Sequence, residues 1–274
     1  MSLRPRRAAR LAPFVPSVLL LAAACDRAPL RWDAPTLATA ETDLPRSMAR
    51  LPAAAMPTDA RGVRCDSSLR IARRAGADVV AAWWVVRGDS TAVLLAARGE
   101  VMRASRAPWE ATTASWEPAV AIDTLDRGPH GCARPAPAIA FEPRTGYVHV
   151  SYALDAPEGT GVFFAHSMDA GRMYHSPVAI VYGPRLVRSA IAVRRDTVAV
   201  AYEDPNADDP PQVALALSVT AGHLFEQKSI VVTAGAYAAS MPEVALDDAG
   251  VTVGWREQRP EREVPMRRRA TWAR

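Results

Sequence analysis

The 274-residue sequence lacks the short motifs that mark several large classes of enzyme. It has no glycine-rich phosphate loop and no G-x-S-x-G string, so neither a P-loop nucleotide site nor the nucleophile elbow of an α/β-hydrolase is predicted. The histidines show neither H-x-x-x-H nor H-E-x-x-H spacing, and we expect structural roles for them and no bound metal or cofactor. They are His130, His149, His166, His175 and His223.

Long hydrophobic runs are also scarce, and the longest apolar stretch is at the N-terminus. A basic head precedes apolar residues 11–24, which are too few to span a bilayer comfortably and end in small residues, as in a secretory signal peptide. Residues 21–25 (LAAAC) resemble a bacterial lipobox, although Ala22 stands where that motif prefers leucine. We therefore predict a signal peptide over residues 1–24, a lipidated Cys25 and export to a periplasm-facing membrane.

Two alternatives to lipidation remain open at this point. Cleavage after residues 22–24 (AAA) would release a secreted protein, and a surface-exposed lipoprotein is a further option. An uncleaved anchor helix is disfavoured by Pro13 and Pro16, which interrupt helices.

The excess of positive charge belongs mostly to this leader. The whole chain has 33 basic and 29 acidic residues, but residues 1–24 hold four arginines and no acid. The remaining chain is therefore close to neutral, and no nucleic-acid partner is expected. Residues 267–269 (RRR) are a local exception, read as a solvated tail or as a contact for lipid headgroups or an acidic partner.

Cysteine is rare, with three residues in the chain. If Cys25 carries lipid, Cys65 and Cys132 remain, and in an oxidising compartment they can form a disulfide. Whether the two side chains meet is not given by the sequence, so two free thiols stay an alternative.

Residues 26–62 are rich in proline and alanine and lack sustained periodicity. We expect residues 25–62 to form an extended tether, with one strand around residues 30–32. From residue 63 on, short runs of alternating small and β-branched residues recur between turn residues, and no amphipathic helix is sustained. Runs ending on Trp83, Tyr152, Tyr202 and Trp255 repeat at a period of about fifty residues, which is typical of propeller blades.

One turn-like string also repeats. Residues 167–174 (SMDAGRMY) are matched 51 positions later by residues 218–225 (SVTAGHLF), which keep the serine, the glycine and the aromatic residue. Serine and aspartate side chains bond nearby backbone amides, and glycine allows a positive φ, so the string predicts a tight turn. The residues that define the two copies of this string are Ser167, Asp169, Gly171, Tyr174, Ser218, Gly222 and Phe225.

This string resembles the Asp-box (BNR) repeat of sialidase-like β-propellers. The resemblance implies an all-β fold in which the box joins the two outer strands of a blade, opposite the active-site face. We expect about four blades, near residues 63–125, 133–183, 184–236 and 237–274, with five as the alternative. The N-terminal segment would supply the missing outer strand of the last blade and close the ring.

The resemblance also raises the alternative of a glycosidase of exo-α-sialidase type. Residues 69–72 (LRIA) stand near the place of that family's Arg-Ile-Pro element, but the proline is absent. The remaining arginines, the Tyr–Glu pair and the acid of that family cannot be assigned here, so a non-catalytic binding or scaffolding module with a protein partner at the membrane is expected first. A glycan ligand remains a further option.

The loops opposite the boxes are the expected binding face. They join the second and third strands of each blade and are rich in charge. We place the candidate binding residues there, with the EDPN string of residues 203–206 as the preferred position. They are Glu203, Asp204, Asn206, Asp155 and Glu158.

Overall fold

The computed structural model describes residues 30–38, 62–74, 78–103, 111–207, 209–233 and 235–273. Cys25 and the predicted signal peptide lie outside these residues. The described chain is nearly all β-strand, as predicted, with 3₁₀ turns at Asp66–Ser68 and Gly131–Ala133. No helix among the described residues is long and apolar enough to cross a membrane.

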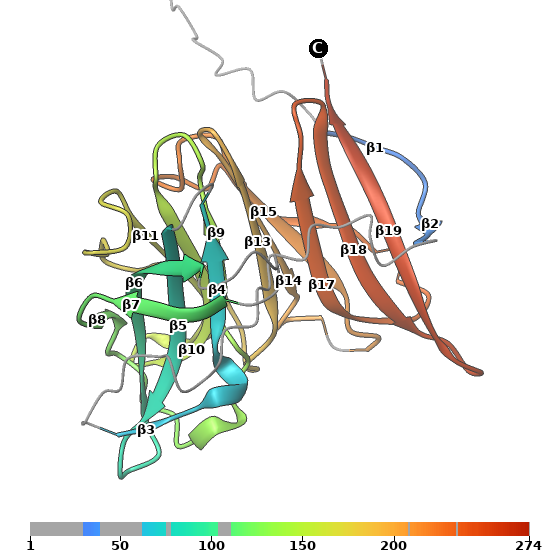
Figure 1. Cartoon of the computed structure of the whole chain (residues 1–274). Helices are drawn as coiled ribbons and strands as arrows, with labels where there is room; N and C mark the ends of the chain where they lie inside the picture. The colour runs from blue at the N-terminus through green and yellow to red at the C-terminus, as the bar shows by residue number, and fades with distance from the viewer. Residues whose placement is uncertain are drawn as a thin grey trace, which may run out of the picture.

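The strands form four antiparallel sheets that follow one another along the chain as blades (Figure 1). The first blade contains β3 (Val63–Arg64), β4 (Arg70–Arg73), β5 (Asp78–Val86), β6 (Ala92–Arg103), β7 (Ala111–Trp116) and β8 (Val120–Asp123). The second contains β9 (Ala138–Phe141), β10 (Val148–Ala156), β11 (Gly159–Ser167) and β12 (Val178–Tyr182). The third contains β13 (Ser189–Arg194), β14 (Thr197–Glu203), β15 (Val213–Ser218) and β16 (Gln227–Val231).

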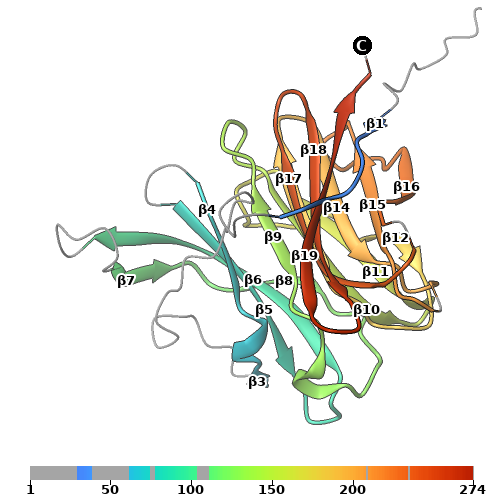
Figure 2. The same cartoon turned by 90° about the vertical axis from the view of Figure 1, so that its right-hand side faces the viewer.

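The fourth blade takes strands from both ends of the described chain. It contains β17 (Ala238–Leu246), β18 (Gly250–Gln258) and β19 (Glu263–Trp272), with β1 (Leu30–Trp32) and β2 (Thr36–Leu37) paired along β19 (Figure 2). The predicted strand at residues 30–32 is confirmed as the outer strand of this blade. The expected solvated tail is wrong, because residues 267–269 lie within β19, a strand paired on both sides.

The alternating runs form strands because both of their faces are buried. In β14, Val198, Val200 and Tyr202 pack into the core shared with the second blade. Ala199 and Ala201, on the other face of β14, pack into the core shared with the fourth. The aromatic residues that end the runs are all buried, as expected. Small and β-branched residues suit this geometry because neighbouring sheets approach closely on both sides.

The innermost strands lie in a row, with β4 next to β9, β9 next to β13 and β13 next to β17. Among the described residues, β17 and β4 show no packing of comparable extent, so the expected closure of the ring is not seen between the first and fourth blades (Figure 1). The four blades therefore form an arc.

Strand direction divides the connections between two faces. Turns between the first and second strands, and between the third and fourth, lie at one end of the strands, which we call the turn face. Hairpins between the second and third strands, and the links between blades, lie at the opposite end, which we call the loop face. The two repeated strings lie on the turn face, between β11 and β12 and between β15 and β16.

The two strings form the same turn. In the first, the Ser167 hydroxyl donates to the Asp169 carboxylate (2.7 Å) and accepts from the Gly171 amide (2.8 Å). The Asp169 carboxylate also accepts from the amides of Arg172 and Met173, and these bonds lower its pKa although partial burial opposes them. Gly171 adopts a φ of 92°, which favours glycine.

The second turn replaces the carboxylate with a hydroxyl. Ser218 Oγ accepts from the Gly222 amide (3.1 Å), and Thr220 Oγ1 accepts from the Leu224 amide (2.9 Å). Each turn also packs on the preceding blade: Gly171 lies against Val80 of β5, and Gly222 against Phe164 of β11. The turns therefore fasten neighbouring blades together as well as closing their own.

Gly222→Ala should destabilise the protein by roughly 3 kcal/mol, because the new methyl group would overlap the Phe164 ring at a φ of 85°. Urea unfolding of the processed chain would measure the change. Gly88→Ala is the matched control, since nothing lies within 4 Å of the added carbon there. Equal unfolding midpoints for the two variants would contradict the fastening role.

Candidate binding face

Glu203 ends β14 on the loop face and joins two blades. Its carboxylate accepts from the Arg188 amide of its own blade (3.2 Å) and from the Met241 amide of β17 (2.9 Å). Met241 has a φ of 53° beside a bulge in the β17–β18 ladder, and this bend turns its amide toward Glu203. Glu203 therefore acts as a brace between the third and fourth blades.

The residues after Glu203 form a loop that is held from within. Asp204 accepts from the Asn206 amide (2.9 Å), and Asn206 donates its side-chain amide to the carbonyl of Tyr182 (2.7 Å). Arg185 donates to the Asp204 carbonyl (3.1 Å). The predicted binding position is thus a rigid loop whose polar groups are already bonded.

Asp155 and Glu158 lie on the second blade and are not joined to this loop. Asp155 accepts from the Thr160 hydroxyl (2.8 Å) and lies 3.2 Å from His130 Nε2, whereas Glu158 is exposed. No hydrogen bond or ion pair in the described part of the chain links the two sets of acids. The same residues contain no group of three His, Cys, Asp or Glu side chains with metal-binding geometry.

Exposed apolar and aromatic side chains surround the braced loop. Tyr182 is 49% exposed at the end of β12, Tyr237 40% exposed just before β17, and Met241 47% exposed within β17. Arg259 stacks over the Tyr237 ring at 5.2 Å. Asn206 and Glu203 bond the backbone of Tyr182 and Met241 respectively. Tyr237 lies two residues before Ala239, whose amide donates to the Pro211 carbonyl in the same β14–β15 loop, so the three exposed residues border that loop.

Two arginines lie at the starts of innermost strands on the same face. Arg70 begins β4 and donates to the carbonyls of Ser67 (3.1 Å) and Leu69 (2.7 Å), with no carboxylate partner among the described residues. Burial, and then the positive charge of Arg188, lower the pKa of Arg70. Arg70 and Arg188 together form a positive region, and neither guanidinium pairs with a carboxylate in the described part of the chain.

A buried polar pair joins the first two blades. The Tyr152 hydroxyl donates to the Asp123 carboxylate (2.7 Å), and both residues are nearly inaccessible to water. Burial raises the pKa of Asp123 and raises the pKa of Tyr152 well above its usual value. A tyrosine beside a carboxylate is also found in nucleophile pairs, but no substrate could reach this one, so its role is structural.

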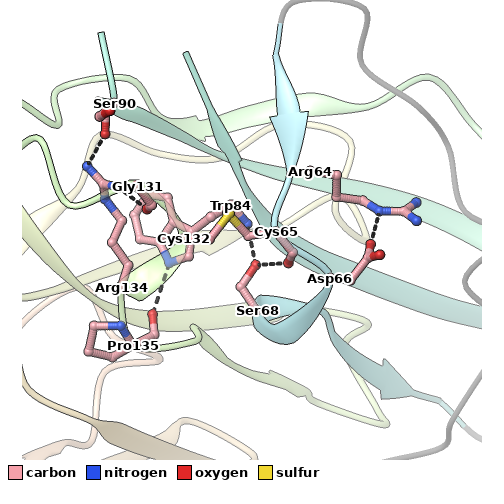
Figure 3. The surroundings of a disulfide bond; sticks show 10 residues. All are labelled: Arg64, Cys65, Asp66, Ser68, Trp84, Ser90, Gly131, Cys132, Arg134 and Pro135. Atoms are coloured by element: carbon pink, nitrogen blue, oxygen red, sulfur yellow. Dashed lines mark hydrogen bonds and ion pairs between the residues drawn. A yellow bond between two sulfur atoms is a disulfide. The ribbon is translucent and has the colours of Figure 1, made fainter. Parts of the chain in front are cut away.

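The predicted disulfide is confirmed, with Cys65 and Cys132 bonded and their Cα atoms 5.3 Å apart (Figure 3). It ties the link between the first two blades to the edge of the first. Beside it, the buried Arg134 pairs with Asp126, lies over the Trp84 ring at 5.9 Å and donates to the Ser90 carbonyl at 3.2 Å. The link is therefore fixed by a covalent bond and a buried ion pair together.

Replacing both cysteines with alanine should lower the free energy of unfolding by about 4 kcal/mol, because the bridge spans 67 residues of sequence. Denaturant unfolding with and without a reductant would measure it, and reduction of the natural protein should reproduce the loss. An unchanged midpoint in both experiments would contradict this stabilising role.

Four of the five histidines gather on the turn face, which the sequence analysis missed. His166 of β11 stacks on His175 (ring centroids 4.5 Å apart) and meets His223 edge-on (4.7 Å). His149 of β10 lies 6.1 Å from His166 and bonds no group through either ring nitrogen. His175 directly follows the first repeated turn and His223 lies within the second, and the contact between the two blades brings them together.

Burial lowers the pKa of His149 to about 3 and that of His166 to about 4, with further lowering from neighbouring histidines, while Glu142 opposes it at His149. Below the ordinary histidine pKa, the unfolded chain therefore binds protons that the folded chain does not. Stability is complete above about pH 7 and falls as the pH decreases.

His149→Phe should flatten this acid dependence. Between pH 7 and pH 5, the free energy of unfolding should fall by about 2 kcal/mol less in the variant than in the natural protein. Unfolding midpoints at pH 8, 7, 6 and 5 would test this, with pH 8 as the reference at which both proteins hold a neutral side chain. A parallel loss in both proteins would refute the assignment to His149.

Comparison with known proteins gives no family. No family model and no curated protein sequence matches the chain. Solved structures similar to it include the Hadza microbial sialidase Hz136, with a TM-score of 0.49, 15% identity, and coverage of 73% of this chain and 43% of that one. A Trypanosoma rangeli sialidase in complex with sialic acid has a TM-score of 0.38 and 10% identity over 71% of this chain and 43% of its own.

A thermostable family-43 glycoside hydrolase is also similar, with a TM-score of 0.40 and 11% identity over 74% of this chain and 69% of its own. The chain spans half or less of the length of the first two structures that it matches. These neighbours are sialidases and glycoside hydrolases, and at such low identity no activity is carried over from them.

Proposed function

We propose that this protein is an exported, lipid-anchored binding module without catalytic activity, which docks a protein partner through its loop face. A membrane-extrinsic subunit of an envelope complex is one concrete form. The observation that carries the proposal is the surface of Tyr182, Tyr237 and Met241 around the braced loop at residues 203–206. Aromatic residues, methionine and arginine are enriched at protein interfaces, and a rigid loop loses little entropy on binding.

The carboxylates of this face support binding over catalysis. Glu203 holds two blades together, and Asp204 and Asp155 hold their own loops. Most glycosidases use two carboxylates that face one substrate, about 5 to 10 Å apart, whereas sialidases use a tyrosine nucleophile. Of the described loop-face acids, Glu203, Asp204 and Asp155 are instead bonded within the protein, while Glu158 is exposed.

Affinity purification from native membranes in mild detergent, followed by mass spectrometry, tests the proposal. We expect a protein to co-purify. Its recovery should fall at least about tenfold in the double variant Tyr182→Ala/Tyr237→Ala, since interface aromatics contribute strongly to affinity. Val63→Ala is the control, because Val63 is 69% exposed on the first blade. Equal recovery in all variants, or recovery of the protein alone, would overturn this function.

Acidic-sugar hydrolysis is the second candidate, and Arg70 and Arg188 favour it. Two positive side chains without a bonded anion can hold a carboxylate. Turnover of a fluorogenic sialoside by the purified protein, lost in Arg70→Ala, would establish this candidate in place of the binding module.

The anchor is tested separately: processing that is unchanged by globomycin or by Cys25→Ala would count against lipidation.

A further inference from the structure

The two repeated turns present apolar side chains to solvent at matching positions. After the serine of each turn stand Met168 and Val219, which are 43% and 54% exposed. Before the aromatic residue of each turn stand Met173 and Leu224, which are 72% and 58% exposed. We call these four residues the turn-tip patch. Neither pair is needed by the turn itself, whose bonds use serine, aspartate or threonine side chains and backbone amides.

The two halves of the patch are adjacent. His175 follows the first turn and His223 lies within the second, and both rings contact the ring of His166. The rings of His175 and His223 are 6.3 Å apart. The patch is therefore one surface, shared by the second and third blades, and not two separate tips.

The charged side chains beside the patch are held by hydrogen bonds and an ion pair within the protein. The Asp169 carboxylate accepts the amides of Arg172 and Met173, and the Arg172 guanidinium pairs with Glu117 at 3.2 Å. The Arg172 charge is therefore paired, and the Asp169 carboxylate keeps its hydrogen bonds beside an apolar environment.

The chain enters the fold on this same face. Leu30 pairs with Trp272, whose amide donates to Ala249 in the turn between β17 and β18. That turn is tied to the next, because Asp248 pairs with Arg194 at 2.6 Å. The Ala221 amide of the second repeated turn then donates to the Asp196 carbonyl. Figure 1 shows the C-terminus and the start of β1 at the end of the molecule where β9 and β17 end.

The distance from the fold to the predicted anchor is short. Cys25 precedes Leu30 by five residues, and five fully extended residues span at most about 18 Å. A lipid on Cys25 would therefore hold the bilayer surface close to the turn face of the fourth blade. A face held that near a bilayer, with exposed methionine, valine and leucine side chains at protruding turns, is suited to shallow insertion below the headgroups.

We infer that the turn-tip patch rests on the lipid bilayer in which the Cys25 lipid is inserted, so that the turn face lies toward the membrane and the loop face away from it. This inference rests on the lipid anchor of the proposed function. The anchor alone would hold the chain at the membrane, and apolar insertion of the turn tips would fix which face lies toward the bilayer.

The test uses the full chain, purified from membranes and placed in phosphatidylethanolamine–phosphatidylglycerol vesicles. Met173→Cys and Leu224→Cys carry an environment-sensitive fluorophore, and Glu158→Cys, exposed on the loop face, is the matched control. We expect blue-shifted emission at residues 173 and 224, with at least about threefold stronger quenching by spin-labelled lipid than at residue 158. Mass spectrometry of the N-terminal peptide reports lipidation of Cys25 independently.

The outcomes separate the two ideas. A lipidated protein with equal quenching at all three positions would overturn the orientation and leave the anchor standing. If residues 173 and 224 are shielded only in native membranes and cross-link to a protein there, the patch binds a protein partner and not the bilayer. An N-terminal peptide without acyl chains would remove the anchor and the inference together.

Discussion

The first three blades of this protein bury both faces of their sheets, and much of the structure follows from that constraint. It explains the Ala/Val-rich second strands, in which successive residues enter different cores. It also explains why the aromatic residue that ends the run falls on the face toward the preceding blade in Tyr152, Tyr202 and Trp255. A sheet with one wet face would show polar alternation instead.

The first and fourth blades, at the two ends of the arc, differ in the chemistry of their outward faces. Trp83 points away from the second blade into an apolar cluster built from residues of the first blade itself. On the fourth blade, the face opposite the shared core carries Thr252, Gly254, Arg267 and Arg269, with Arg269 bonded to Thr252 and Asp247. A polar face needs no further blade to cover it. The chemistry of these two faces therefore does not favour packing of the fourth blade directly on the first.

Local pattern was sufficient to predict the strands, the repeated turns and the strand at residues 30–32, because period-two alternation and turn chemistry are encoded by neighbouring residues. Arg267 to Arg269 were misread because three consecutive charges resemble a solvated tail. In β19, Arg267 and Arg269 lie on one face, while Arg268 stacks over Trp32 at 5.1 Å. The histidine cluster and the bracing role of Glu203 depend on contacts between blades, which a single sequence does not reveal. The disulfide was an even alternative for the same reason.

The turn face and the loop face of the arc hold different kinds of residues. The turn face holds the fastening turns, the histidine cluster and the start of β1, which concern the attachment of blade to blade and of the fold to the predicted anchor. The loop face holds Glu203, Asp204 and Asp155, whose carboxylates are bonded within the protein, and the exposed residues Tyr182, Tyr237 and Met241. Because strand direction puts the two sets at opposite ends of every blade, an anchor that draws one face to a surface presents the other to whatever the protein binds.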